Sequence, residues 1–194
     1  MRLILASTSP ARRHMLAAAG LNAPGVASNV DEAALKAAFT GPPAALALAL
    51  AQAKAAAVAR HHPGALVIGA DQLLVCEGKV FDKPADLPEA AAHLRALSGR
   101  RHELITALCV LQDGAPPWTH IATAHLSVRP LSEAFIARYL AAEGSPILGC
   151  VGAYRLEGLG AQLFEHIEGD YFTILGLPLL ALLGVLRGRG VLAG

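Results

Sequence analysis

The chain has 194 residues, of which 54% are hydrophobic and 16% are charged, and its net charge is +1. This hydrophobic content supplies a sizeable core and excludes a disordered chain. The balanced charge lacks the global basic field of nucleic-acid binders, so any anion site has to be local and we expect no nucleic acid as a partner. We predict one domain over residues 1–194, or two closely packed lobes.

In chain order, the patterns predict a strand at 2–7, a helix from Pro10 to about Ala19, a short strand at 25–29, an Ala-rich helix at about 43–61, a strand at 65–71 and a hairpin at 72–81. They next predict a helix at 87–98 with Gly99 just past its end, strands at 102–114 and 118–128, and a helix at 132–144. The chain is expected to end with a Gly-rich loop with a short strand at 149–164 and a final helix at 175–188. Ser9 is the expected N-cap of the first helix, and the hairpin is expected to turn at Glu77-Gly78. This mixture predicts an α/β fold, a two-lobed mixed sheet with flanking helices and a central substrate cleft.

Neither long apolar stretch predicts a membrane span. The Ala/Leu stretch at 44–59 contains Gln52 and Lys54, and the stretch at 173–188 is interrupted by Gly and Pro. No signal peptide is recognisable at the N-terminus. The cysteines form no C-x-x-C pair and lie in apolar surroundings, which favours buried, inert thiols; they are Cys76, Cys109 and Cys150. We expect a cytoplasmic location and no membrane as a partner.

The opening stretch "LILASTSPARRHML" predicts a strand, a Ser/Thr-rich turn and a helix. Such a turn presents backbone N–H groups to an anion, and the hydroxyl of Ser7 lies in it. Arg12 and Arg13 would stand at the positive end of the helix dipole, which is unfavourable unless an anion binds there. Their guanidinium groups suit phosphate. The alternative is an ordinary capped helix with two surface arginines.

Two acids are candidates for catalysis or metal binding. Asp71 is expected to end the apolar strand "LVIGAD", at the edge where such sheets bind ligands. It suits a Mg²⁺ ligand or a base toward water, and the alternative is a turn residue that caps the next element. Glu32, beside Asp31, is a second ligand or base, or simply the first acid of a helix.

Two lysines complete the candidate set. Lys54 is the only charge between Pro43 and Val58 of its apolar helix, where it either extends to solvent or meets an anion. Lys83 lies in the loop "FDKPAD", where no structural role is evident. The histidines lack zinc-ligand spacing, and neither a P-loop nor a G-x-S-x-G motif is present.

Together these segments resemble the Maf family of septum-formation inhibitor-like nucleoside triphosphate pyrophosphatases. The resemblance covers nearly the whole chain, and it rests on "LILASTSPARRHML", "VDEAAL", "LALAQAKAAAVA", "VIGADQLLVCEGKVFDKPAD", "LRALSGRRHELITALCVL" and "VGAYRLEGLGAQLFEHIEGDYFTILGLPLL". It implies a Maf or inosine-triphosphatase-like fold. It also implies hydrolysis of a nucleoside triphosphate to the monophosphate and pyrophosphate, with water attacking the α-phosphorus.

The resemblance implies a role for each candidate. Ser7, Arg12 and Arg13 would bind the triphosphate, so that substrate phosphate supplies the anion that the arginines lack. Lys54 and Lys83 would neutralise charge on the leaving pyrophosphate. Asp71 would accept a proton or bind metal, and Glu32 would assist with Mg²⁺ or Mn²⁺; the sequence does not separate base from ligand.

Substrate choice follows from three further positions. Gln72 and Glu157 resemble the family branch that acts on 7-methyl-GTP, whereas Thr and Gln occur there in the branch that acts on dTTP and UTP. A carboxylate at Glu157 accepts hydrogen bonds from the N1–H and amine of guanine. Ala11 departs from the Trp that the first branch can carry, so another modified nucleotide stays open as substrate.

Other functions also stay open. A dTTP/UTP pyrophosphatase, an enzyme for deaminated purines, and a nucleotide-responsive cell-division inhibitor that acts by binding are the alternatives. The resemblance further implies a homodimer, for which the apolar C-terminal helix is one candidate contact. Burial within a single chain explains the same helix equally.

Overall fold

The computed structural model describes residues 1–193. Its elements, in chain order, are β1 (Leu3–Leu5), α1 (Pro10–Ala18), α2 (Glu32–Ala38), α3 (Pro43–Ala59), β2 (Leu66–Cys76), β3 (Lys79–Phe81), α4 (Leu87–Leu97), β4 (Arg101–Leu111), β5 (Trp118–Val128), α5 (Glu133–Glu143), short 3-10 helices at Ser145–Gly149, Val151–Ala153 and Leu159–Leu163, β6 (Phe164–Glu168), α6 (Tyr171–Ile174) and α7 (Leu179–Gly188). The strands pair in the order β1-β2-β4-β5-β6, and β3 pairs with β2. This mixed α/β sheet confirms the predicted fold class.

The chain forms two compact units. The first consists of residues 1–72, 106–122 and 171–194, and the second of residues 73–105 and 123–170. Strands β2, β4 and β5 contribute residues to both units. The expectation of a two-lobed protein is thereby met, whereas the single domain over residues 1–194 stays a prediction.

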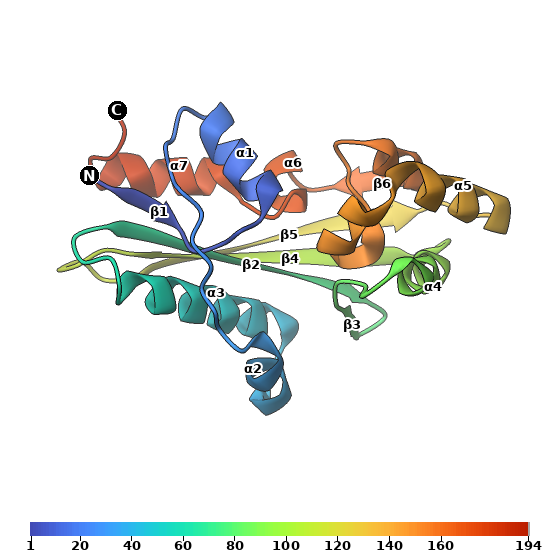
Figure 1. The fold of residues 1–194 in the computed structure, drawn as a ribbon, viewed down its shortest axis with the longest axis horizontal. Coiled ribbons are helices and arrows are strands. Elements are labelled where there is room, and N and C mark those ends of the chain that lie inside the picture. Colours follow the sequence, from blue (N-terminus) through green and yellow to red (C-terminus); the bar gives the residue numbers. More distant parts are fainter. Residues whose placement is uncertain (194) are drawn as a thin grey trace. The chain divides into compact units, whose positions relative to one another are not determined.

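The first unit is layered, with helices on both faces of its strands. Strand β1 runs parallel to β2, pairing Leu3 with Leu66. Figure 1 shows α1 and α7 on one face of these strands and α3 on the other. Helix α3 lies directly against β2 because Gly69 has no side chain: a Cβ there would lie 2.1 Å from the carbonyl oxygen of Ala51. This close approach brings α3 side chains to the face of β2.

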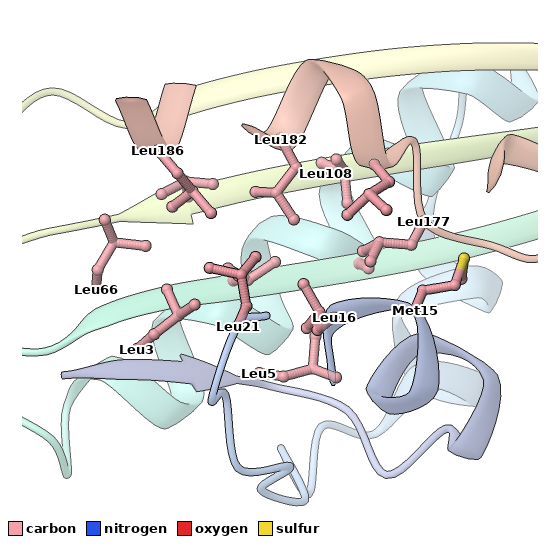
Figure 2. Packing of buried hydrophobic residues seen from close by; sticks show 14 residues of the cluster. Leu3, Leu5, Met15, Leu16, Leu21, Leu66, Leu108, Leu177, Leu182 and Leu186 are labelled. Carbon is pink, nitrogen blue, oxygen red and sulfur yellow. The ribbon is translucent and has the colours of Figure 1, made fainter. Parts of the chain in front are cut away.

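Leucine side chains fill the core between β1, β2, β4, α1 and α7 (Figure 2). Among its fully buried members are Leu5, Leu16, Leu66, Leu108 and Leu182. Each buried leucine of this kind contributes about 1.5–3 kcal/mol relative to an exposed one. The C-terminal helix α7 therefore belongs to the core of its own unit, which explains its apolar sequence without a partner chain.

The second unit contains residues 73–76 of β2, 101–105 of β4 and 123–128 of β5, together with β3, β6 and the helices α4 and α5. The β2–β3 hairpin turns at Glu77 and Gly78, as predicted, and both residues have positive φ (50° and 77°). Consecutive positive φ values are typical of the tight turn that joins two antiparallel strands. Strand β6 pairs antiparallel with the end of β5, and α4 packs against α5.

The predicted starts of two helices, α1 and α5, are confirmed. The Ser9 side chain caps α1 by accepting from the Arg12 N–H, and Ser132 caps α5 by accepting from the Phe135 N–H. These caps satisfy N–H groups that have no partner within the helix. Local sequence is sufficient for such contacts because donor and acceptor are only three residues apart.

Several predictions about elements are wrong. Asp71 does not end a strand, since β2 runs without a break from Leu66 to Cys76 and Asp71 lies in its middle. The predicted strand at 25–29 is reduced to a single bridge between Leu5 and Gly25. The last helix begins at Leu179 rather than 175. Pro178 has no backbone N–H to donate to a preceding helical turn, and its ring would clash with that turn.

Helix α2 was not predicted as an element, but the alternative for Glu32 as the first acid of a helix is confirmed, because Asp31 is the N-cap of α2 and Glu32 its first residue. Within residues 1–193, no helix is long and apolar enough to cross a membrane. The three cysteines are free thiols; Cys76 and Cys109 are buried as expected, but Cys150 is only half-buried. Burial raises the pKa of all three thiols, that of Cys109 to about 11, which keeps them protonated and unreactive.

Candidate active site

Lys54 connects the two predicted acids in the first unit. Its Nζ lies 2.6 Å from Asp71 Oδ1 and 2.8 Å from Glu32 Oε1. Asp71 comes from the middle of β2, Lys54 from the face of α3 that lies against β2, and Glu32 from the first turn of α2. Of the two alternatives for Lys54, the contact with an anion is therefore correct, and the anions are carboxylates of the chain itself.

The three side chains differ in exposure, and this sets their electrostatics. The side chains of Lys54 and Asp71 are 10% and 8% exposed, whereas that of Glu32 is 43% exposed. Burial raises the pKa of Asp71, and the charge and hydrogen bond of Lys54 lower it in part. A raised pKa makes the carboxylate bind a proton more readily than an exposed aspartate does. Asp71 is thus the strongest candidate for proton transfer.

The guanidinium group of Arg12 is bound by protein atoms rather than extended into solvent. Its Nε donates to the carbonyl oxygen of Gly176 at 2.7 Å, and its Nη1 donates to Ala70 O at 3.0 Å and to Ser7 Oγ at 3.2 Å. Burial lowers the pKa of Arg12, while the charges of Asp71 and Glu32 raise it, so Arg12 lies within the field of the two acids. The guanidinium adds a fixed positive charge beside them.

Arg13 and Ala11 occupy other faces of the same helix. Arg13 is exposed in the first turns of α1, and Ala11 is half-buried. The structure therefore separates the two arginines that the sequence presents together: Arg12 is anchored by protein atoms, and Arg13 is available to an incoming anion. Ser7 is the second anchor of this turn, since its Oγ also accepts from the Ser9 N–H at 3.2 Å.

Gln72 follows Asp71 and has its amide orientation determined by three acceptors. Its Nε2 lies 2.9 Å from Thr106 Oγ1, 2.9 Å from Thr173 O and 3.1 Å from Ile174 O. The Thr106 hydroxyl donates in turn to Thr173 O. Because two of the acceptors are backbone carbonyls, only the NH₂ group can face them. The Oε1 atom is then the part of Gln72 that remains to accept from a ligand.

Lys83 and Glu157 belong to the second unit and are both exposed. Lys83 lies in the segment between β3 and α4, and Glu157 in the turn before the last 3-10 helix. The charges of both act on the Cys150 thiol, Glu157 raising its pKa and Lys83 lowering it, in addition to the larger effect of burial. Both residues therefore lie in the neighbourhood of Cys150.

The donor set of the first unit fits a hard divalent cation. The carboxylates of Asp71 and Glu32 converge on one point, the Nζ of Lys54. Mg²⁺ is typically bound by one or two carboxylates together with water and substrate phosphate oxygens. Among the described residues no group of three or more His, Cys, Asp or Glu side chains is arranged to hold a metal. Phosphate and water would have to complete the shell, which is the arrangement that Mg²⁺ tolerates.

Sequence reasoning missed the residues that hold the candidates in place. Thr106 and the Gly176 carbonyl orient Gln72 and Arg12, yet they lie 34 and 164 residues away from these partners in the chain. Glu143, at the end of α5, holds the turn that carries Glu157. The signal in the sequence was an acid at the last position of a predicted helix, directly before Gly144, because that position is unfavourable for a negative charge.

Fold and site define a mixed α/β protein with a buried lysine between two acids. The family model described as Maf-like protein matches residues 2–189, and the chain belongs to this family. A protein of Hyphomonas neptunium named nucleoside triphosphate pyrophosphatase is 53% identical over 99% of this chain and 98% of its own length.

Two further relatives are named 7-methyl-GTP pyrophosphatase. That of Rhizobium meliloti is 53% identical over 98% of this chain and 97% of its own length. That of Rhizobium johnstonii is 51% identical over 100% of this chain and 98% of its own length. A solved dITP/XTP pyrophosphatase from Mycobacterium abscessus aligns over 98% of this chain and 96% of its own, with 14% identity and a TM-score of 0.42, a likeness too distant to bear on fold or function.

Proposed function

We propose that this chain hydrolyses a nucleoside triphosphate to the monophosphate and pyrophosphate, and that its preferred substrate is 7-methyl-GTP. The observation that carries the proposal is the contact of Lys54 with both Asp71 and Glu32, with Arg12 beside them. The chain belongs to the Maf-like family, and relatives that are 53% identical to it are named pyrophosphatases.

Asp71 is proposed to accept the proton of the attacking water. Its burial raises the pKa of the carboxyl, so the carboxylate binds a proton more readily than an exposed aspartate does. Lys54 holds Asp71 Oδ1 at 2.6 Å and thereby orients the carboxylate. Water attacks the α-phosphorus, the bond to the bridging oxygen breaks, and pyrophosphate leaves with that oxygen. Such chemistry rests on positioning and charge neutralisation rather than on a covalent intermediate.

The arginines and lysines are proposed to interact with different phosphate groups of the substrate. Arg13, exposed in α1, and the N-terminus of that helix bind the triphosphate, while Arg12 keeps its protein contacts and contributes charge. Ser7 fixes the turn that precedes the helix. Lys54 and Lys83 would offset the charge that develops on the leaving pyrophosphate.

A divalent cation, Mg²⁺ or Mn²⁺, is proposed as cofactor, held by Asp71 and Glu32. When bound, it would neutralise phosphate charge and polarise a phosphoryl oxygen. Because Lys54 Nζ contacts the same two carboxylates, the lysine keeps them converged in the protein alone. We further propose a cytoplasmic location, where the three free thiols persist, and a homodimer.

The preference for 7-methyl-GTP rests on Gln72 and Glu157. Gln72 presents an amide oxygen, because its NH₂ group is bound by three protein acceptors. Glu157 presents an exposed carboxylate. Both groups accept hydrogen bonds, which matches the N1–H and exocyclic amine donors of a guanine. The relatives from two Rhizobium species named 7-methyl-GTP pyrophosphatase support this assignment. Ala11 offers no aromatic ring to a methylated base.

The test of this assignment replaces both acceptor residues. The double variant Gln72→Thr with Glu157→Gln is compared with wild type for pyrophosphate release from 7-methyl-GTP, GTP, UTP, dTTP, CTP and ATP. We expect wild type to favour 7-methyl-GTP and the variant to shift toward UTP and dTTP. An identical ranking in both proteins would contradict the branch assignment, and a wild-type preference for UTP and dTTP would replace it with the dTTP/UTP alternative.

A further inference from the structure

One carboxylate in the second unit holds both ends of the turn that carries Glu157. Glu143 Oε2 accepts from Arg155 Nε at 2.9 Å and from Arg155 Nη2 at 2.5 Å. The other oxygen, Oε1, accepts from the backbone N–H of Leu159 at 3.1 Å. Within the turn, the Gly158 N–H donates to Arg155 O at 3.2 Å. Glu157 thus lies in a closed loop whose two ends bind the same side chain.

The location of Glu143 is energetically unfavourable unless it is compensated. It is the last residue of α5, where the helix dipole disfavours a negative charge, and its side chain is only 2% exposed. Arg155 supplies the compensation, and the charge and hydrogen bond of Glu143 raise the pKa of that guanidinium in turn. Because buried ion pairs of this kind are often no more stable than apolar packing, stability alone is a weak reason for one here.

The apolar residue at the end of this turn is partly exposed to solvent. The side chain of Leu159 is 42% exposed and lines a cavity of about 210 Å³ together with Phe135 and Tyr139 of α5. The backbone is nevertheless tightly folded, since a Cβ on Gly160 would lie 2.3 Å from Arg155 O. The polar contacts on both sides of Glu157 converge on Glu143.

The segment that leads into the turn is also held in a single conformation. Gly152 and Ala153 both have positive φ, 77° and 57°, and the second value is unfavourable for alanine. The Tyr139 hydroxyl donates to Ala153 O at 3.3 Å, and the neighbouring Tyr154 hydroxyl lies 2.7 Å from His102 Nε2. Such a conformation persists only where the surroundings determine it, which is typical of segments that present a functional side chain.

We propose that Glu143 and Arg155 are positioning residues for base recognition: they hold the turn in the shape that presents the Glu157 carboxylate to the nucleobase. Neither residue contacts substrate; Glu143 acts through Arg155 and the Leu159 N–H. The inference rests on the proposed role of Glu157 in substrate choice. A preformed turn keeps the carboxylate from losing conformational freedom on binding, which strengthens recognition of the base without altering the reacting atoms.

The test is steady-state kinetics of pyrophosphate release with 7-methyl-GTP and UTP. The variants are Glu143→Gln, Arg155→Lys, Glu157→Ala and the double variant Glu143→Gln/Glu157→Ala. Glu133→Gln is the matched control, because Glu133 stands at the other end of α5 and forms a bidentate pair with Arg95 on the surface. We expect Glu143→Gln to raise the KM for 7-methyl-GTP roughly ten- to a hundredfold with kcat nearly unchanged. Activity on UTP stays at its wild-type level in this variant, and Glu133→Gln changes neither substrate.

Non-additivity distinguishes positioning from general structural damage. If Glu143 acts through Glu157, the double variant resembles Glu157→Ala alone, and Arg155→Lys retains part of the selectivity. A Glu143→Gln variant with wild-type selectivity, equal loss on both nucleotides, or losses that add to those of Glu157→Ala would each overturn the inference. Wild-type protein that releases no pyrophosphate would instead overturn the proposed function, and a Glu157→Ala variant with unchanged selectivity would overturn the role of Glu157.

Discussion

Substitution of Lys54 by Met tests the buried pair with Asp71 directly. The pair is 2.6 Å long and its side chains are 10% and 8% exposed. Removing one partner of a buried ion pair costs about 3–5 kcal/mol, because the other charge is left without compensation. The contact with Glu32 adds at most about 1 kcal/mol, since that carboxylate is 43% exposed. We therefore expect Lys54→Met to lower the free energy of unfolding by about 3–5 kcal/mol near neutral pH.

The loss is expected to depend on pH. Burial already raises the pKa of Asp71, and Lys54→Met removes the charge and hydrogen bond that lower it. Between the ordinary and the raised pKa, the folded state of the variant binds more protons than the unfolded state, so its stability falls as the pH rises. Urea unfolding of wild type and variant should thus show a smaller difference at about pH 5 than at about pH 8.

Two further variants complete this experiment. Lys54→Met combined with Asp71→Asn removes both charges, and we expect the loss to shrink to about 1–3 kcal/mol, the cost of a buried amide without its partners. Glu32→Gln is the control, because it alters the exposed contact to the same nitrogen and should change stability by no more than about 1 kcal/mol. A loss that is independent of pH, or a double variant that loses the sum of the single effects, would refute this reasoning.

Three other outcomes are expected. Asp71→Asn should retain its circular dichroism spectrum but release pyrophosphate about 10²–10⁴-fold more slowly, and wild-type activity should fall on acidification at a higher pH than an ordinary aspartate would give; unchanged turnover would exclude Asp71 as the base. Thr106→Val should cost about 0.5–1.5 kcal/mol in urea unfolding, because one hydrogen bond of the Gln72 amide is lost while two carbonyls still accept from it, and the less constrained amide should alter the ranking of nucleotides; a wild-type ranking would speak against this role. Gly69→Ala should cost about 1–3 kcal/mol or more, since its Cβ would meet Ala51 O, whereas Gly184→Ala, with open space in α7, should stabilise by about 1 kcal/mol; thermal unfolding that ranks the two variants in the opposite order would contradict the proposed packing of α3.

Local signals predicted much of the fold. The N-cap at Ser9, the hairpin turn at Glu77 and the long Ala-rich helix were all recognisable, because each depends on residues close together in the chain. The short helix α2 was not recognised, since seven residues give little hydrophobic periodicity. Only its first residue gave a signal, since Glu32 was interpreted either as a ligand or base or as the first acid of a helix.

The location of Asp71 shows where sequence reasoning fails. The residues "LVIGADQLLVC" are apolar except for Asp71 and Gln72, and Asp71 was interpreted as the end of one strand and Gln72 as the start of a separate hairpin. The structure instead continues the strand through both residues. Tertiary contacts outweigh local preference here, because Lys54 on α3 and Thr106 on β4 supply partners that a strand interior otherwise lacks.

The candidate site was predicted in its members but not in its contacts. Lys54, Asp71 and Glu32 were singled out for their charges. The contact of Lys54 with both acids could not be predicted, because it depends on the packing of α2 and α3. Likewise, the two adjacent arginines looked equivalent in sequence. Only the fold distinguishes Arg12, bound to carbonyls from distant segments, from the exposed Arg13.

The central claim is that water attacks the α-phosphorus of a nucleoside triphosphate. It is tested most directly by turnover of 7-methyl-GTP in water enriched in heavy oxygen, with Mg²⁺ present, followed by mass spectrometry of the products. We expect one heavy oxygen in the nucleoside monophosphate and none in pyrophosphate, and turnover that is about 10²–10⁴-fold slower in Asp71→Asn. Label in pyrophosphate or orthophosphate, or unchanged turnover in Asp71→Asn, would contradict the claim.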